Sequence, residues 1–415
     1  MTARLRHEIL AGISTFLTIL YLFVVYPQLF ASSGIEIGSA FTATVLMTAI
    51  GTLFVGVYAK SPLALGPGLG AGAFLIYSLG AGEKIPWPTV LGVVFCSAFL
   101  LFLFSLFKLR QKLIYHLPPA LKIGTMAGIG LFLICIGLRE LNIIARDPDT
   151  FWRFLGVGGS AHMVALFSLV LLLILYQQRV AGCYIIAILF GWAVGYYLDL
   201  FPLDRIVSWS PPSIFPIAMK VDLAAALSPG MLSSLLALFL IQIFDTSASI
   251  TTLTKMSDGT EVSHLNRLVM TDGPSSMVSS LLGIGPLSFL IESSAGIKAG
   301  GRSGTTAITV AILSLATLFF FPFVSSIPLF ATAPVLLVLG GTLAAEIRGL
   351  PWKNFADFAP ALLTFVTIPL TFSLYAGFAF GFVSYTILKA LRGQASQVHP
   401  ICWILTVFFI YHFFS

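Results

Sequence analysis

The sequence predicts an all-α polytopic membrane protein, with about fourteen transmembrane helices in two inverted seven-helix repeats. Of 415 residues, 58% are hydrophobic and only 9% are charged, and apolar runs recur along the whole chain, with a mean hydropathy of +1.00. So few charges could not cover a soluble globule of 44.6 kDa. A third observation predicts the repeat: an interrupted apolar segment occurs in both halves, at equivalent places.

Apolar runs of about 17–25 residues, the length that crosses a bilayer, define the predicted spans. The first is too long for a signal-peptide core and is predicted to be a transmembrane helix. The stretch 399–415 is short for a span, so we expect an interfacial or lipid-facing helix there, with a fifteenth span as the alternative. The predicted spans are 9–31, 38–58, 62–80, 88–107, 118–138, 162–178, 181–200, 229–252, 265–283, 287–298, 304–322, 326–345, 355–373 and 375–391.

Two of these segments, 62–80 and 287–298, are predicted to be broken helices. The first opens Pro62-Leu-Ala-Leu-Gly-Pro-Gly-Leu-Gly-Ala-Gly72, and the second follows Gly283-Ile-Gly-Pro286. Non-helical backbone at membrane depth is tolerated only where it is buried in protein or lines a wet cavity. The two segments lie in opposite halves, 1–200 and 229–391, separated by the proline-rich connection 201–228. They therefore predict a central site between inverted repeats.

Three acids lie well inside predicted spans: Asp245, Asp272 and Glu292. An ionisable group at membrane depth is costly, so each is a candidate functional residue. Gln242 and Asp245 are three residues apart and share a helix face that also carries Ser249. The alternative for each acid is a buried hydrogen-bond hub that ties helices together.

The distribution of lysine and arginine predicts a cytoplasmic N-terminus, because positively charged loops stay inside. The loops on the opposite side hold fewer: Lys84, Arg139, Arg146, Arg153, Arg205 and Lys220. Those on the N-terminal side are Arg4, Arg6, Lys60, Lys108, Arg110, Lys112, Arg179, Lys255, Arg267, Lys298, Arg302, Arg348, Lys353, Lys389 and Arg392.

Other function classes have little support in the sequence. The four cysteines have no CxxC spacing and the six histidines form no metal-binding pattern, so neither a metal site nor an enzyme is predicted, and no cofactor is expected. Without a dense basic run, nucleic acid is not an expected partner. The long apolar helices carry no repeated polar stripe that would line a channel. A non-transporting sensor stays open as an alternative.

Several segments resemble the AzgA-like hypoxanthine, guanine and adenine permeases. This family belongs to the nucleobase:cation symporters, which include xanthine and uracil permeases. The matching segments are Glu8-Ile-Leu-Ala-Gly-Ile-Ser-Thr-Phe-Leu-Thr18, Ile243-Phe-Asp-Thr246, Ile291-Glu-Ser-Ser-Ala-Gly-Ile-Lys-Ala-Gly-Gly-Arg-Ser-Gly-Thr305, Ala331-Thr-Ala-Pro334 and Ile368-Pro-Leu-Thr-Phe-Ser373.

This resemblance implies that a core domain of spans 1–4 and 8–11 moves against a gate domain of spans 5–7 and 12–14, in a homodimer. Substrate would bind between broken spans 3 and 10, and protons would drive uptake, with Na⁺ as the alternative coupling ion.

The resemblance also assigns site residues. Glu292 takes the position of the carboxylate that holds the purine, and Asp272 that of the acid in span 9. The family carries an aspartate where this chain has Gln242, an asparagine in place of Gly72, and an asparagine in place of Tyr26. The predicted substrate-binding residues are Glu292, Gln242, Gly72, Ala71, Ser293, Ser288 and Tyr26, and the predicted proton-coupling residues are Asp245, Asp272 and Glu292.

The sequence therefore predicts a proton-coupled importer of a purine nucleobase in the inner or plasma membrane, working by alternating access. A carboxylate at Glu292 suits the ring N–H donors of a nucleobase, and Gly72 leaves space for a bulkier substrate or a water. The alternative is a transporter of the same fold for another heterocycle or a small anion.

Overall fold

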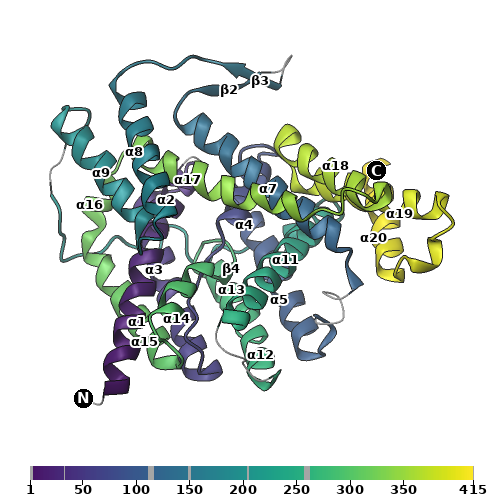
Figure 1. Ribbon diagram of the computed structural model, residues 1–415, viewed down its shortest axis with the longest axis horizontal. Coiled ribbons are helices and arrows are strands. Elements are labelled where there is room, and N and C mark those ends of the chain that lie inside the picture. The colour runs from purple at the N-terminus through teal and green to yellow at the C-terminus, as the bar shows by residue number, and fades with distance from the viewer. Residues whose placement is uncertain are drawn as a thin grey trace.

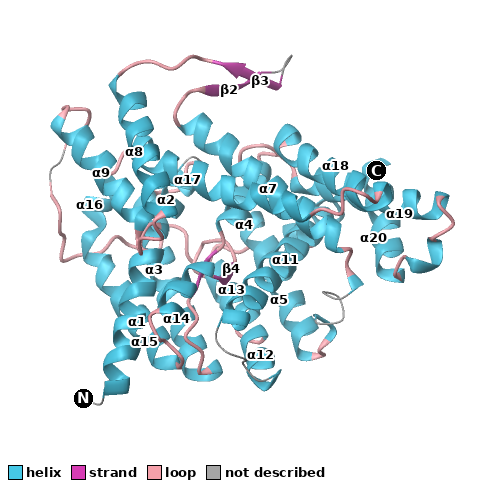
Figure 2. Ribbon diagram, viewed as in Figure 1, coloured by secondary structure: helices cyan, strands magenta, loops and turns pink. Residues whose placement is uncertain are grey.

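The computed structural model describes residues 3–31, 33–110, 116–147, 151–202, 205–256 and 262–414, and within these ranges the protein is mainly helical (Figures 1 and 2). Nine helices in this part of the chain are long and apolar enough to cross a membrane, and four shorter apolar helices accompany them: Leu69–Gly80, Cys183–Tyr197, Phe355–Thr371 and Pro400–Tyr411. The predicted class, a polytopic helical membrane protein, is confirmed, while the number of fourteen spans stays a prediction.

The first half of the chain holds the elements from α1 to α9. They are α1 (Ala3–Ile19), α2 (Leu22–Ala31), α3 (Ile37–Phe54) with η1 (Val55–Ala59), β1 (Leu65–Pro67), α4 (Leu69–Ala73) with η2 (Phe74–Gly80), α5 (Trp87–Leu106), α7 (Pro119–Glu140), β2 (Ile144–Asp147), β3 (Phe151–Phe154), α8 (Ser160–Gln177) and α9 (Cys183–Tyr197).

The second half begins after the long connection that follows α9. Its elements are α10 (Leu223–Ala226), η3 (Pro229–Met231), α11 (Leu232–Met256), α12 (Val262–Val269), α13 (Asp272–Leu281), β4 (Leu287–Phe289), η4 (Ile291–Ser293), α14 (Ser294–Lys298), α15 (Gly304–Ala316), η5 (Thr317–Phe320), α16 (Phe321–Ser326), α17 (Leu329–Ala344), η6 (Ala345–Gly349), α18 (Phe355–Thr371), α19 (Leu374–Leu391), η7 (Ala395–Gln397) and α20 (Pro400–Phe414).

Two spans predicted as continuous helices are interrupted. The first breaks between Ile19 and Leu22, after a last turn in which the Thr18 hydroxyl donates to the carbonyl of Thr15 at 2.7 Å. Such side-chain bonds to the preceding turn bend helices. The ninth breaks between Val269 and Asp272, because Pro274 lacks an N–H and is accepted only in the first turn of the next helix.

The loop between α7 and α8 contains a short hairpin that the sequence analysis did not predict. Strands β2 and β3 pair antiparallel with Ile144 opposite Phe154. The hairpin projects from one end of the molecule, and the N-terminus lies at the opposite end (Figure 1). The connection between α7 and α8 therefore contains regular secondary structure.

Two segments of the family resemblance meet at the start of α15. The Glu8 carboxylate accepts hydrogen bonds from the Thr306 hydroxyl at 2.5 Å, from Arg302 N at 3.2 Å and from Ser303 N at 3.3 Å, while the Glu8 side chain is only 4% exposed. It satisfies amides at the N-terminus of α15, which would otherwise have no partner. Glu8 thus joins the beginning of the chain to span 11.

We expect Glu8→Ala to lower the stability of the folded protein by about 2–3 kcal/mol, because it leaves buried N–H and hydroxyl groups without their charged acceptor. The measurement is thermal unfolding of the detergent-solubilised protein followed by size-exclusion chromatography. Glu8→Gln keeps one acceptor oxygen and should recover part of the loss. A melting temperature equal to that of the unsubstituted protein would show that this contact does not hold α15 in place.

Candidate functional site

The two broken spans cross at the centre of the molecule. Strand β1 of span 3 and strand β4 of span 10 pair antiparallel, with Gly66 opposite Ser288. Two further bonds extend the pairing, from Gly68 N to the carbonyl of Pro286 at 3.3 Å and from Leu290 N to that of Ala64 at 3.1 Å. Each break thus satisfies the backbone groups that the other leaves open, as a membrane interior requires. The broken spans predicted by the sequence are confirmed.

A close approach explains glycine at position 68. A Cβ there would lie 3.0 Å from the Ser288 hydroxyl and 3.2 Å from Oδ2 of Asp245. Asp245 on α11 and Ser288 on β4 are therefore both packed against the backbone that opens the span-3 half-helix. Any larger residue at position 68 would displace these two polar groups.

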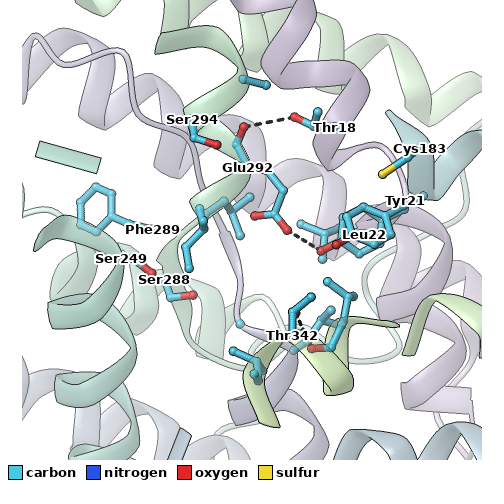
Figure 3. Close-up of a pocket in the computed structure, with 18 of the residues that line it drawn as sticks. Thr18, Tyr21, Leu22, Cys183, Ser249, Ser288, Phe289, Glu292, Ser294 and Thr342 are labelled. Atoms are coloured by element: carbon cyan, nitrogen blue, oxygen red, sulfur yellow. Dashed lines mark hydrogen bonds between the residues drawn. The ribbon is translucent and has the colours of Figure 1, made fainter. Parts of the chain in front are cut away.

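Glu292 lies at the start of the span-10 half-helix and points into a cavity (Figure 3). Its Oε1 accepts a hydrogen bond from the Tyr21 hydroxyl at 2.7 Å, and its backbone carbonyl accepts one from Thr18 at 3.3 Å. Thr18 lies in the last turn of α1, and Tyr21 lies in the break that follows it. The interrupted first span therefore supports the Glu292 half-helix, and this carboxylate interacts with a neutral hydroxyl.

The cavity has a volume of about 1130 Å³, and its lining includes residues at the crossing of β1 and β4. Its deep part carries the carboxylates of Asp245 and Glu292 together with Ser249 and Ser288. Its mouth, at the ends of α8, α14 and α17, carries Arg179, Lys298 and Glu346. The carboxylates of Asp245 and Glu292 suit a ligand with N–H donors.

Aromatic and polar contacts join η2, α7, β3 and the end of α18 outside the cavity lining. The Ser78 hydroxyl of η2 donates to the carbonyl of Phe372. The Phe372 ring packs against Phe132 at 4.9 Å and against Trp152 of β3 at 5.0 Å between ring centroids. The Tyr77 hydroxyl donates to Glu140 at 3.3 Å.

Among the predicted site residues, the cavity brings together Ala71, Asp245, Ser288 and Glu292. Gln242 lies outside its lining. The Gln242 side chain is 3% exposed and donates from Nε2 to the Ser97 hydroxyl of α5 at 2.8 Å. Three residues along a helix turn the side chain by about 60°, which directs Gln242 to α5 while Asp245 reaches the cavity. A binding role for Gln242 stays a prediction.

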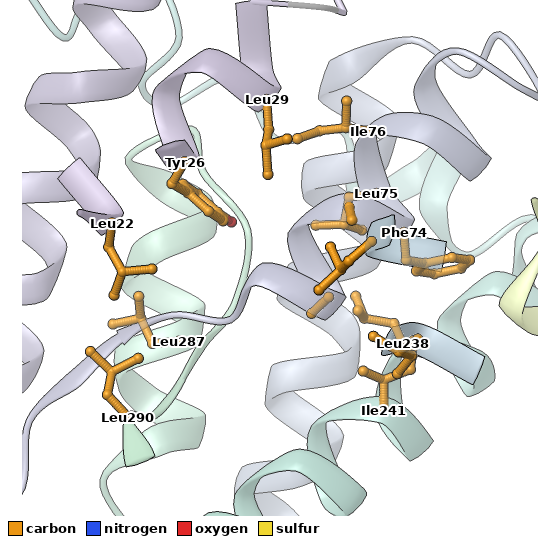
Figure 4. Close-up of a cluster of buried hydrophobic side chains, with 14 of the residues drawn as sticks. Leu22, Tyr26, Leu29, Phe74, Leu75, Ile76, Leu238, Ile241, Leu287 and Leu290 are labelled. Atoms are coloured by element: carbon orange, nitrogen blue, oxygen red, sulfur yellow. The ribbon is translucent and has the colours of Figure 1, made fainter. Parts of the chain in front are cut away.

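Tyr26 and Gly72 also lie outside the lining, and they pack against each other (Figure 4 shows Tyr26 in this buried cluster). A Cβ on Gly72 would lie 2.5 Å from Cε2 of Tyr26, and one on Gly285 would lie 2.6 Å from the Tyr26 hydroxyl. The expectation that Gly72 leaves space for a larger substrate or a water is therefore wrong, because the Tyr26 ring occupies that space. Tyr26 and Gly72 therefore form one packing contact in this protein.

Ser293 and Asp272 have structural partners of their own. The Ser293 hydroxyl accepts from Ala64 N at 2.9 Å and so ties span 10 to span 3. Asp272 is fully buried in a two-bond ion pair with Arg110, Nη1 to Oδ1 at 2.9 Å and Nη2 to Oδ2 at 2.7 Å. Arg110 is only 1% exposed, so the expectation that it is a loop charge at the membrane surface is wrong. A coupling role for Asp272 stays a prediction.

Tyr21 and Tyr184 both line the cavity but were not among the predicted site residues. Each lies in a strongly apolar run, where a tyrosine is common and gives no signal of its own. Only the break after Ile19 turns Tyr21 toward Glu292. Within the described residues, no group of three or more His, Cys, Asp or Glu side chains is placed to hold a metal ion.

This architecture, with two crossing half-helices that line a cavity in a helical membrane protein, is that of a membrane transporter. The chain belongs to the Permease family of xanthine and uracil permeases, whose model matches residues 6–380. Among solved structures, it is similar to the transmembrane domain of the cyanobacterial bicarbonate transporter BicA, with a TM-score of 0.72 at 16% identity, covering 91% of this chain and 98% of that one. It is also similar to the murine anion transporter Slc26a9 in its inward-facing state, with a TM-score of 0.70 at 15% identity, covering 95% and 69%. These two likenesses establish the fold.

Similar sequences extend over nearly the whole chain. The putative permease MJ0326 of Methanocaldococcus jannaschii is 36% identical, covering 99% of this chain and 95% of that protein. The guanine/hypoxanthine permease PbuG of Bacillus subtilis is 32% identical, covering 98% and 96%. The adenine permease AdeP of Escherichia coli is 29% identical, covering 98% and 92%. The protein is therefore a permease of the nucleobase family and not an enzyme.

Proposed function

We propose that this protein imports a purine nucleobase of the hypoxanthine, guanine and adenine class together with protons. It does so by alternating access across the cell membrane, with its N-terminus in the cytoplasm. The observation that carries the proposal is the Glu292 carboxylate at the start of the span-10 half-helix, which points into a cavity that Asp245 and Ser288 also line. The similar adenine and guanine/hypoxanthine permeases support the substrate class.

The chemistry of a purine fits this cavity. Its ring N–H groups donate to a carboxylate, and an ionised carboxylate offers about four acceptor positions. Glu292 would accept hydrogen bonds from one edge of the base. The polar groups next to Gly68, which are Asp245 and Ser288, would face the other edge of the base. The cavity volume, about 1130 Å³, leaves room for a planar bicyclic ring and water.

Coupling to protons needs an acid that can exchange its proton as the cavity changes sides. Asp245 and Glu292 both line the cavity, whereas Asp272 is held in its ion pair with Arg110. We therefore propose that Asp245 and Glu292 carry the coupling in this protein. The movement would carry the core spans past the gate spans, and a homodimer would anchor the gate.

The proposal predicts saturable uptake of radiolabelled hypoxanthine, guanine or adenine by cells that lack their own nucleobase permeases. A protonophore should abolish accumulation, because the inward proton gradient supplies its free energy. Asp245→Asn should retain binding of the base but lose the response to the protonophore. Xanthine, uracil, sulfate and bicarbonate serve as comparison substrates.

The outcomes separate the alternatives. Uptake of an anion and of no base would favour the small-anion alternative. The bicarbonate transporter BicA, which has a similar fold, is the reason for testing this alternative. Uptake of a base that follows a sodium gradient and ignores the protonophore would identify Na⁺ as the coupling ion. If the protein is present in the membrane in normal amounts but no base is taken up, the proposed function is contradicted.

A further inference from the structure

A tyrosine at the break of the first span is bonded to the proposed substrate carboxylate. Tyr21 lies between α1 and α2, and its side chain is 2% exposed. Its hydroxyl donates to Oε1 of Glu292 at 2.7 Å, across 271 residues of sequence (Figure 3). A hydrogen bond to an ionised acceptor is about twice as strong as a neutral one. The bond therefore restricts the direction in which the carboxylate points.

The ring of Tyr21 packs against a second tyrosine that lines the cavity. It packs against Tyr184 of α9, with 4.8 Å between ring centroids and a tilt of 46°. Nearby, a Cβ on Gly182 would lie 3.2 Å from the carbonyl of Leu17, so the turn between α8 and α9 abuts the end of α1. By the predicted domain division, α1 belongs to the core and α9 to the gate. The pair of tyrosines thus spans the two bodies that would slide during transport.

We propose that Tyr21 is a positioning residue for nucleobase binding. Its hydroxyl holds the Glu292 carboxylate toward the N–H edge of the base, and Tyr184 holds Tyr21 in place from the gate helix. The carboxylate keeps acceptor positions for the base while Oε1 accepts from Tyr21. Tyr21 then sets the affinity for the base and the selectivity for a ligand with N–H donors, with little influence on the maximal rate. This inference rests on the proposed function.

Tyr21→Phe removes one hydroxyl and retains the ring that packs on Tyr184. We expect the KM for the transported base to rise about tenfold or more, as loss of a hydrogen bond to a charged group implies, with a maximal rate within about twofold of the original. Tyr184→Ala removes the ring that packs on Tyr21 and should raise KM in the same direction as Tyr21→Phe. Tyr196→Phe, farther along α9 and outside the cavity lining, is the matched control for loss of a tyrosine hydroxyl.

A second readout separates positioning from a general loss of structure. The base and an analogue methylated at a donor nitrogen are compared as competitors of uptake in both proteins. If Tyr21 directs Glu292 toward that donor, Tyr21→Phe weakens the parent base more than the methylated analogue, and their affinity ratio shrinks. A damaged fold would weaken both alike.

An unchanged KM and an unchanged affinity ratio in Tyr21→Phe would overturn the positioning role while leaving the proposed function intact. Failure of the unsubstituted protein to transport or bind any base would overturn both. If Tyr21→Phe does not accumulate in the membrane, Tyr184→Ala decides the matter: a raised KM supports the proposal, and an unchanged KM contradicts it.

Discussion

Glu292→Ala is expected to abolish saturable uptake of the nucleobase while leaving the amount of protein in the membrane unchanged. The carboxylate would accept about two hydrogen bonds from the base, each worth about 1.5–3 kcal/mol at a charged acceptor. Their loss corresponds to a more than hundredfold weaker affinity. The measurement is initial uptake rate against base concentration, beside quantification of the protein in isolated membranes.

The comparison with Glu292→Gln refines this expectation. The amide keeps the size of the side chain and one acceptor oxygen but carries no charge, so some binding of the base should survive without proton-dependent accumulation. Glu36→Gln, an exposed acid before α3 whose hydrogen-bond partner is Ser39, is the control for charge removal elsewhere. Normal saturable uptake by Glu292→Ala would place the substrate site outside this cavity.

Arg110→Ala is expected to destabilise the folded protein by about 3–5 kcal/mol. Both members of the Arg110–Asp272 pair are buried, so removal of the arginine leaves the Asp272 carboxylate without its counter-charge in an apolar interior. The pair also joins the chain beyond α5 to the break before α13, where Arg110 Nη1 donates to the carbonyl of Val269 at 3.2 Å. We expect a large fall in the melting temperature of the solubilised protein.

Removal of both charges should cost less than removal of the arginine alone. In Arg110→Ala with Asp272→Asn no uncompensated charge stays buried, so part of the lost stability returns. Arg392→Ala removes an exposed arginine, which donates to Asn354, and should change stability by less than about 1 kcal/mol. A double variant as unstable as Arg110→Ala would assign the loss to packing instead of charge.

The same double variant tests the predicted coupling role of Asp272. If Asp272 exchanged a proton in each cycle, a folded protein without its carboxylate would take up the base independently of the proton gradient. If the pair is a structural bond within the core spans, uptake by the folded double variant should still respond to a protonophore.

The predicted fold class followed from short-range properties of the chain. The length and hydropathy of its apolar runs required helices in a bilayer, since every backbone group there needs a partner within the protein. The glycines and prolines around Gly68 and Pro286 interrupt a helix, so they marked the two broken spans, whose backbone groups need partners within the protein. Glu292 and Asp245 stood out because an acid at membrane depth is costly. Each of these signals is carried by residues close together in the chain.

Tertiary structure decided which polar groups share the cavity. Gln242 and Asp245 are separated by less than one helical turn, yet only the packing of α11 against α5 determines that Gln242 meets Ser97. Arg110 carries the same charge as any loop arginine, and only the approach of α13 buries it beside Asp272. These outcomes depend on contacts between residues far apart in the chain, which local composition does not encode.

By itself, then, the sequence determined a helical membrane protein with two broken spans and an intramembrane carboxylate at Glu292. Only the tertiary structure decided that Tyr26 fills the space above Gly72 and that Tyr21 reaches Glu292 from a break in the first span. The physical reason is that hydropathy and backbone chemistry act along the chain. A hydrogen bond between spans 1 and 10 instead requires the whole fold to bring its two ends within 2.7 Å.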